Sequence, residues 1–169
     1  MSIEILTLPP EQWQQYRQIR LEALQTDPQA FGASYADNLT RPDAYWRERL
    51  AEAARGEQSW LLFARAEGRI IGMMGAYRTG EDEVHVIAVY VSPQWRGRGV
   101  STALMTRLLE EIARDPAIRT ATLGVTKGQD AALALYRRFG FEITGEKSVE
   151  MGDGQIHDQI LMARAVEAQ

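Results

Sequence analysis

The sequence predicts one α/β domain in which a mixed, mostly antiparallel sheet carries helices on both faces. Three observations support this fold class. The chain has 169 residues, the size of one ordinary domain. Its hydrophobic residues alternate in some segments and recur at helical spacing in others, in the order β-α-α-β-β-β-α-β-α-β-β. A strand–helix–strand unit in the second half requires a parallel pair, while short turns elsewhere favour antiparallel neighbours.

Glycine, proline and polar clusters set the boundaries of the predicted elements. Strands are expected at residues 2–8, 60–65, 69–77, 84–92, 119–126, 141–149 and 155–164. Helices are expected at residues 9–26, 40–56, 99–114 and 129–139. Residues 27–39 lack a sustained period and predict an irregular connector with one helical turn. The second helix is expected to begin at Thr40, because Thr40 and Asp43 resemble a capping box.

The composition excludes several classes of function. The chain contains no cysteine, so it has no disulfide, no thiolate metal ligand and no cysteine nucleophile. Only His85 and His157 offer imidazoles, so no metal is expected. The net charge of −4 provides no overall attraction for nucleic acid. No apolar run approaches the ~20 residues of a bilayer span and no secretion signal is recognisable, so we expect a cytoplasmic protein without a membrane partner.

The segment from Val89 to Thr102 carries the strongest chemical signal. An apolar strand leads through a loop with Gly97, Gly99, Arg96 and Arg98 directly into a helix. The first turn of a helix has free backbone N–H groups, and glycines let the main chain approach an anion closely. The loop lacks the lysine of a P-loop and the third glycine of a dinucleotide fingerprint. The residues therefore favour a pyrophosphate held by another kind of loop.

Two motifs give this region a family resemblance. Residues 94–99, Gln-Trp-Arg-Gly-Arg-Gly, resemble the Gln/Arg-x-x-Gly-x-Gly/Ala acyl-CoA loop of the GNAT family of N-acetyltransferases. Residues 129–141 are similar to that family's Asn-x-x-Ala-x-x-Leu-Tyr-x-x-x-Gly-Phe helix, with Gln129 in place of the usual Asn. The resemblance covers nearly the whole chain. It implies a GNAT-like fold, a single N-acetyltransferase domain over residues 1–169 and acetyl-CoA as co-substrate.

The same resemblance implies a set of cofactor contacts. Backbone N–H groups of the loop would hold the CoA pyrophosphate, and the main chains of Val89 and Val91 would pair with the pantetheine amides at a splay in the sheet. The amide of Val91 would also donate to the developing oxyanion. The side chains of Arg96 and Arg98 are expected to add charge-assisted bonds to the phosphates. The implied cofactor-binding residues are Val89, Val91, Gln94, Arg96, Gly97, Arg98, Gly99, Val100, Ser101 and Gln129.

Three side chains are candidates for proton transfer. Tyr136 stands where the family has its general acid, and a phenol can protonate a departing thiolate. An alkyl amine is mostly protonated at neutral pH, so the acceptor needs a base. His85 falls near the family's position for that base, with Glu83 two residues earlier on the same strand face. The alternatives stay open: a half-buried helix aromatic at Tyr136, an ordinary strand residue at His85 and a solvated turn around Glu83.

By resemblance, the acceptor lies between the first two helices, their connector and the final hairpin near residues 151–155. Phe31, Tyr35 and Trp46 would line this site or pack as core aromatics. The predicted function is acetyl transfer to the primary amine of a small molecule or amino acid, by direct attack in a ternary complex. A protein or peptide amine, favoured by the acidic residues 81–83, and a non-catalytic acyl-CoA-binding module are the alternatives. A homodimer is compatible with the sequence.

Overall fold

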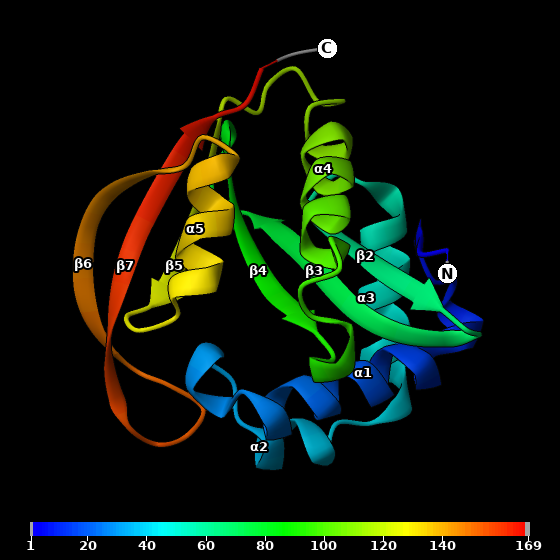
Figure 1. Ribbon diagram of the computed structural model, residues 1–169. Helices are drawn as coiled ribbons and strands as arrows, with labels where there is room; N and C mark the ends of the chain where they lie inside the picture. The colour runs from blue at the N-terminus through cyan, green and yellow to red at the C-terminus, as the bar shows by residue number, and fades with distance from the viewer. Residues whose placement is uncertain (1, 168–169) are drawn as a thin grey trace.

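The computed structural model describes residues 2–167 and contains one seven-stranded sheet of order β1-β2-β3-β4-β5-β7-β6 (Figure 1). Each neighbouring pair is antiparallel except β4 and β5, which are parallel. The strands are β1 (Glu4–Leu6), β2 (Ser59–Ala66), β3 (Arg69–Arg78), β4 (Glu83–Val91), β5 (Thr120–Thr126), β6 (Glu142–Glu150) and β7 (Ile156–Ala165). The α-helices are α1 (Trp13–Thr26), α2 (Tyr35–Leu39), α3 (Asp43–Arg55), α4 (Val100–Ile112) and α5 (Asp130–Arg138). Three short 3-10 helices lie at Pro10–Gln12, Pro28–Ala30 and Pro93–Trp95.

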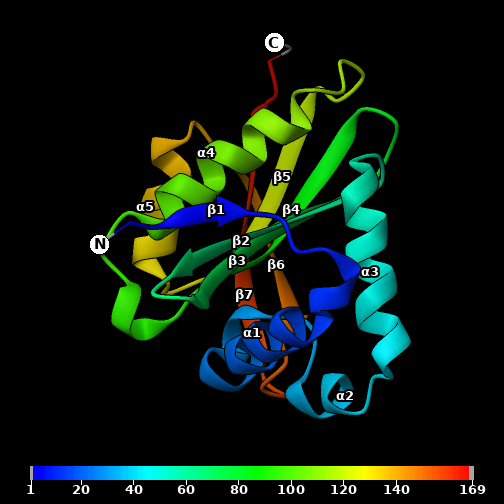
Figure 2. The same cartoon turned by 90° about the vertical axis from the view of Figure 1, so that its right-hand side faces the viewer.

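Helices cover both faces of the sheet, which confirms the predicted fold class. Leu61 and Phe63 of β2 pack in one hydrophobic cluster with α1 and α3. Trp60 and Leu62 of the same strand pack in a second cluster with α4 and α5. This alternation places the two cores on opposite sides of the sheet. Figure 2 shows the two helix layers on either side. Within residues 2–167, none of the helices has the length and hydrophobicity needed to cross a bilayer.

The start of the second long helix differs from the prediction. The capping box at Thr40 is wrong, because α3 begins at Asp43 and Pro42 precedes it in an extended conformation. Thr40 instead ends α2, and its hydroxyl donates to the carbonyl of Asp37 at 3.4 Å. The α2 helix is the helical turn expected in the connector, and Ser34 caps it by accepting the N–H of Asp37 at 3.1 Å. Proline at position 42 fixes the break between these helices.

The parallel pair in the middle of the sheet separates soon after it forms. Residues Glu83–His85 of β4 pair with Thr120–Thr122 of β5, and the register stops there. A register shift in β4 follows, with a positive φ of 59° at Ala88. The extra residue turns Val89 to the same side as Val86, toward the cluster of α4 and α5. The splay and the bulge together open the sheet where the site was expected.

Candidate functional site

Two cavities open where β4 and β5 separate. The first, which we call the α4 groove, has a volume of about 690 Å³ between the end of β4, the start of α4 and α5. The second, the hairpin cavity, has a volume of about 380 Å³ between the connector at residues 30–33, β4, β5 and the β6–β7 hairpin. Both cavities are lined by Val89, Gln129, Ala132 and Tyr136. A ligand lying along the groove would therefore reach the hairpin cavity at these residues.

The N-terminus of α4 forms one end of the groove and lacks a side-chain cap. Gly99 is the N-cap in a left-handed conformation with φ of 82°, and Gly97 has φ of 75°. The N–H of Ala103 bonds back to the carbonyl of Gly99 at 3.0 Å, so the three preceding N–H groups lie ahead of the helical ladder. The residues that carry them, 100–102, line the groove. Free N–H groups and the helix dipole make this end of the groove suitable for an anion.

The main chain of β4 offers further hydrogen-bonding groups to the groove. The N–H of Ser92 bonds to the carbonyl of Ile71 in β3 at 2.8 Å. In an antiparallel ladder this bond turns the N–H and C=O of the preceding residue, Val91, away from β3. Val89 lies two residues earlier, after the bulge, and shares this direction. The polar groups of Val89 and Val91 therefore face the opening left by β5.

The two loop arginines are held differently from the sequence prediction. The Nε of Arg96 donates to the carbonyl of Val91 at 2.9 Å, and its guanidinium pairs with the carboxylate of Asp27 at 2.7 Å. The guanidinium of Arg98 lies 5.0 Å from the ring of Trp95 and does not line the groove. Arg96 thus ties the end of β4 to the end of α1. The phosphate contacts expected of the two guanidinium groups stay a prediction, since both groups are engaged within the protein.

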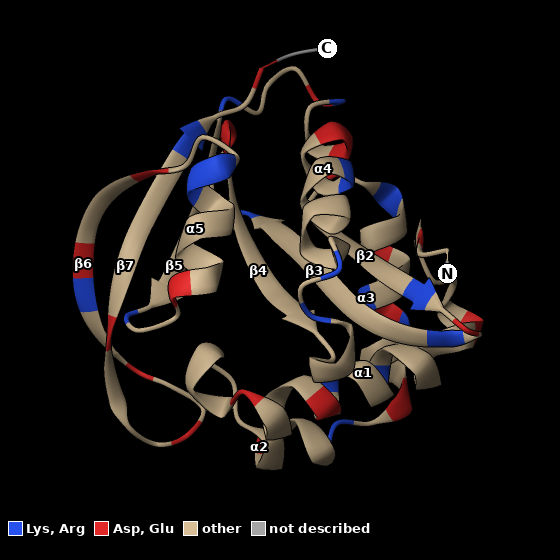
Figure 3. Cartoon of the chain, in the orientation of Figure 1, with Lys and Arg blue, Asp and Glu red and all other residues tan. Residues whose placement is uncertain are grey.

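A cationic residue not predicted from the sequence, Arg138 at the end of α5, also lines the groove. Figure 3 shows basic residues both in the loop before α4 and at this end of α5. Arg137, the neighbour of Arg138 in α5, does not line the groove. The signal was available, because Arg138 follows the Leu-Tyr motif by two residues at a helix end. Gln129, the N-cap residue of α5, lines both cavities, and its contact with the cofactor stays a prediction.

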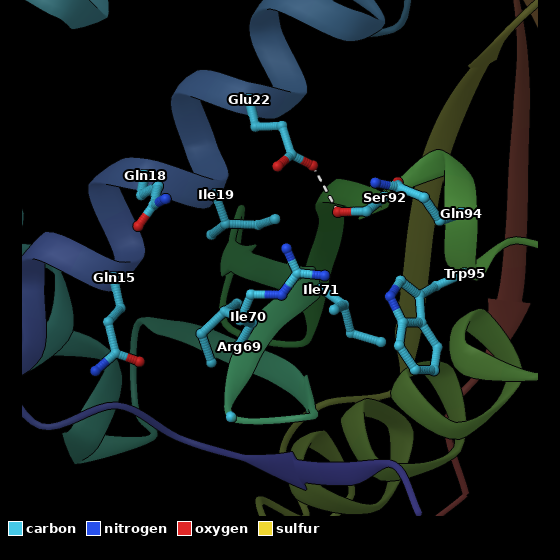
Figure 4. Close-up of a pocket in the computed structure, with 11 residues that line it drawn as sticks. Gln15, Gln18, Ile19, Glu22, Arg69, Ile70, Ile71, Ser92, Gln94 and Trp95 are labelled. Atoms are coloured by element: carbon cyan, nitrogen blue, oxygen red, sulfur yellow. Dashed lines mark hydrogen bonds between the residues drawn. The ribbon is translucent and has the colours of Figure 1, made fainter. Parts of the chain in front are cut away.

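Gln94 lies outside the α4 groove. Its side chain lines a smaller cavity between α1, the start of β3 and residues 92–95 (Figure 4). The carboxylate of Glu22 there accepts bonds from Ser92 Oγ at 2.5 Å and from the hydroxyl of Tyr90 at 2.7 Å. Burial raises the pKa of Tyr90 to about 12, so this hydroxyl stays protonated as a donor. These bonds hold α1 against the end of β4.

Tyr136 stands at the wall between the two cavities. Its side chain is 5% exposed and packs edge-on against Phe141, with ring centroids 6.1 Å apart. Within residues 2–167 its hydroxyl makes no hydrogen bond. Burial raises the pKa of Tyr136 well above its ordinary value of 10.0. The phenol is therefore neutral at physiological pH and its proton is free for a ligand.

His85 lines the hairpin cavity. Its Nδ1 lies 2.8 Å from Thr122 Oγ1, and that oxygen lies 3.4 Å from the carbonyl of Val84. We assign the ring proton to Nδ1 with Thr122 Oγ1 as its acceptor, an assignment that leaves the lone pair on Nε2. Burial lowers the pKa of His85 below 6.5, the charge of Lys147 lowers it further, and Glu83 opposes them. The imidazole is neutral at pH 7 and can accept a proton.

The acidic residues expected near the acceptor lie elsewhere. Glu83 lines neither cavity, and its carboxylate accepts the hydroxyl proton of Thr79 at 2.8 Å. Glu81 and Asp82 also line neither cavity. In the described residues, 2–167, no acidic side chain lines the hairpin cavity, and no group of three or more potential metal ligands occurs. The acidic groove considered for a cationic peptide is therefore not formed by residues 81–83.

The three aromatic residues proposed for the acceptor site separate in the structure. Phe31 lines the hairpin cavity. Tyr35 begins α2 and packs with the α1–α3 cluster without lining the cavity. Trp46 is fully buried, edge-on to Tyr16 with ring centroids 5.1 Å apart, and belongs to the core.

Two tertiary contacts shape the hairpin cavity, and the first joins the final hairpin to the connector that the resemblance placed beside it. The N–H of Gly152, in the β6–β7 turn, donates to the carbonyl of Phe31 at 2.6 Å and joins the hairpin to the connector. Arg20 of α1 also lines the cavity, with its guanidinium 5.4 Å from the ring of Phe31. Neither residue belongs to a local motif. The contact of Gly152 depends on the packing of segments far apart in the chain, and that of Arg20 depends on how the connector folds back against α1.

Two relatives of known activity resemble the chain in sequence. The L-amino acid N-acetyltransferase AaaT of Escherichia coli is 29% identical over 137 residues, which cover 77% of this chain and 83% of that protein. The N-alpha-acetyltransferase RimI of Mycobacterium tuberculosis is 34% identical over 141 residues, covering 71% of this chain and 82% of that protein. The two relatives differ in their acceptors, so sequence similarity alone leaves the acceptor open.

Solved structures and a family model agree on the fold and the family. A GNAT-family acetyltransferase from Streptococcus pneumoniae has a TM-score of 0.84 at 19% identity, covering 98% of this chain and all (100%) of that one. The yncA protein of Salmonella typhimurium, solved with its cofactor acetyl-CoA, has a TM-score of 0.79 at 18% identity, covering 100% of this chain and 96% of that one. The model of the acetyltransferase (GNAT) family matches residues 9–141. The chain therefore belongs to the acetyltransferase (GNAT) family.

Proposed function

We propose that this protein transfers the acetyl group of acetyl-CoA to the primary amine of a small molecule or amino acid, with donor and acceptor bound together. One observation carries the proposal: the α4 groove and the hairpin cavity meet at Val89 and Tyr136. The groove has the features of an anionic cofactor site, and the hairpin cavity is of a size for a small acceptor. A thioester lying at the shared wall would face an amine in the hairpin cavity.

The donor site offers groups for two parts of CoA, the pyrophosphate and the pantetheine arm. The N–H groups of residues 100–102 and the left-handed Gly97 and Gly99 would hold the pyrophosphate, with Arg138 adding charge. The polar main-chain groups of Val89 would pair with the pantetheine amides as an added strand, and the N–H of Val91 is left for the thioester because its carbonyl accepts the Nε of Arg96. The opening between β4 and β5 leaves these groups unpaired by sheet neighbours.

The transfer needs a base for the proton of the amine and an acid for the departing sulfur, and His85 and Tyr136 are placed to serve these two roles. Acetyl-CoA supplies an activated acyl group, in which a C–S bond is exchanged for a C–N bond. Nε2 of His85 accepts the proton that the amine loses, directly or through water. The hydroxyl of Tyr136 gives a proton to the departing sulfur, while the N–H of Val91 donates to the carbonyl oxygen. Burial raises the pKa of the phenol, and by the same physical cause it disfavours a thiolate formed beside it.

Thiol release from acetyl-CoA, measured beside mass detection of the acetylated product, tests this function directly. A panel of free amino acids, simple amines and short peptides should show release of thiol matched by one N-acetyl product. Tight binding of acetyl-CoA without release for any amine would contradict the enzymatic function and favour a binding module. Preferential acetylation of the peptides would contradict the small-molecule assignment.

A further inference from the structure

We propose that Arg20 binds the carboxylate of the acceptor, so that the acceptor is a free amino acid. The inference rests on the proposed function and deepens it, because it names the chemical class that the hairpin cavity selects. It is carried by the position of a cation that has no anion beside it. Within residues 2–167 the side chain of Arg20 has no ion pair and no hydrogen bond.

The surroundings of Arg20 make an unpaired cation unfavourable. Its side chain is partly buried, and burial lowers the pKa of its guanidinium; Arg49 acts in the same direction, and Tyr16 and Tyr45 oppose the shift. Arg49 itself donates to the hydroxyl of Tyr16 at 3.0 Å, so Tyr16 is already engaged. The ring of Phe31, 5.4 Å away, gives Arg20 only a cation–π contact. An anion in the hairpin cavity would supply the missing partner.

The charge of the hairpin cavity selects for such an anion. Arg20 is its one lining residue, among the described residues 2–167, with a permanent charge, and His85 is neutral at pH 7. A guanidinium offers paired N–H donors in the geometry that a carboxylate accepts. A simple amine or a peptide N-terminus brings no negative group to this position. The acceptor that satisfies Arg20 therefore carries a carboxylate besides its amine.

The reacting groups lie around the same cavity. His85 and Tyr136 line it together with Arg20. An α-amino acid bears its amine and its carboxylate on one carbon, so holding the carboxylate also fixes the position of the amine. Arg20 would thus act as a substrate-binding residue that orients the nucleophile toward the shared wall.

The test compares each amino acid with its own C-terminal amide at saturating acetyl-CoA. The amide keeps the side chain and the amine and lacks the negative charge. The amine of the amide is also less basic, so a larger fraction of it is deprotonated at neutral pH. A preference for the acid therefore cannot arise from a larger fraction of free amine. We expect wild-type kcat/KM to favour the acid by roughly 10- to 100-fold, chiefly through KM.

Variants on one helix locate the origin of that preference. Arg20→Gln should abolish the preference for the acid, and Arg20→Lys should retain part of it because it keeps the charge. Arg17→Gln removes the same charge from the same helix at a residue that does not line the cavity, and it should keep the preference. Thermal unfolding of each variant checks that it is folded. The comparison of acid and amide on the wild type stands even if a variant does not fold.

Three results would overturn the assignment. Equal kcat/KM for acid and amide in the wild type would contradict recognition of the carboxylate, and it would leave the proposed acetyl transfer unaffected. A proportional loss for acid and amide in Arg20→Gln would show a structural role only. Absence of thiol release with every amine would overturn the proposed function as well.

Discussion

The two cavities are built from different kinds of sequence. Two short segments, residues 89–102 and 128–138, together with Asp27 and Gln29, line the α4 groove. The hairpin cavity collects residues from α1, the connector, β3, β4, β5, α5 and the β6–β7 hairpin. The groove therefore depends on local backbone geometry, while the hairpin cavity depends on how distant elements pack. A local motif can identify the donor of this enzyme, and only the folded chain can identify the acceptor.

The cavities also differ in how they present positive charge. The groove relies on backbone N–H groups at the start of α4, which cannot be changed by substituting a side chain. The hairpin cavity relies on one guanidinium, that of Arg20. We propose that donor recognition rests mainly on the main chain, with Arg138 adding charge, and that acceptor recognition rests on side chains. This difference predicts that substitutions in each region affect one ligand and leave the other almost unchanged.

The largest effect is expected where the two cavities meet. Tyr136→Phe should lower kcat by about 100-fold or more, because the departing sulfur loses its proton donor. Isothermal titration with CoA should give a Kd close to that of the wild type, since the phenyl ring still fills its place. Tyr45→Phe removes a hydroxyl at a residue that lines neither cavity, and it should retain full kcat. Wild-type kcat in Tyr136→Phe would rule out the phenol as the acid.

The groove alone should respond to a change at Gly99. Gly99→Ala forces a side chain into a left-handed conformation with φ of 82°, and we expect the Kd for CoA to rise by roughly 5- to 30-fold. Gly68→Ala is the matched control, because Gly68 has φ of 74°, open space around it and a place in the β2–β3 turn. Equal losses of CoA binding in the two variants would indicate a general loss of stability.

The hairpin cavity alone should respond to a change at Gly152. A Cβ there would overlap the carbonyl oxygen of Ala33, so the hairpin must shift from the connector. Gly152→Ala should therefore raise KM for the acceptor by about tenfold at little change in the Kd for CoA. Gly145→Ala, on β6 with open space around it, should leave both values unchanged. Weaker CoA binding in Gly152→Ala would show that the two cavities are not independent.

The smallest effect concerns the pH dependence of the base. Below the pKa of the acceptor amine, log kcat/KM rises with pH with a slope of one, because only the deprotonated amine reacts. Below the pKa of His85 the slope becomes two, because the imidazole must also lose a proton. Since the pKa of His85 is lowered by burial and Lys147, this break lies below pH 6.5. Lys147→Gln removes a repelling charge and should move the break upward, whereas Glu83→Gln should move it downward. A profile without the break, or unchanged by both substitutions, would argue against His85 as the base.

The sequence predicts the fold class and the glycine-containing turn ahead of α4 because their signals are local. Alternating apolar residues predict which face of each strand is buried, and Gly97 and Gly99 ahead of a helix predict an anion site. The bulge at Ala88 lacks such a signal, although it decides which way Val89 and Val91 face. Its conformation follows from the register of β3 against β4.

Side-chain roles were harder to predict than backbone roles. Arg96 and Arg98 have the expected positions, yet Asp27 and the ring of Trp95 engage their guanidinium groups. Asp27 lies at the end of α1, so its pairing with Arg96 requires the tertiary structure. Arg20 gives no signal in a segment typical of an amphipathic helix. Its importance follows from the absence of an anion near it in the described residues, which no pattern of residue types can show.

The most direct test of the account is the initial-velocity pattern, since its central claim is that donor and acceptor occupy adjoining cavities at the same time. Acetyl-CoA is varied at several fixed concentrations of the best acceptor, and reciprocal rates are plotted. Simultaneous occupation predicts lines that intersect, as expected for a chain without a cysteine to carry the acyl group. Parallel lines, the signature of an acyl-enzyme formed before the amine binds, would contradict it.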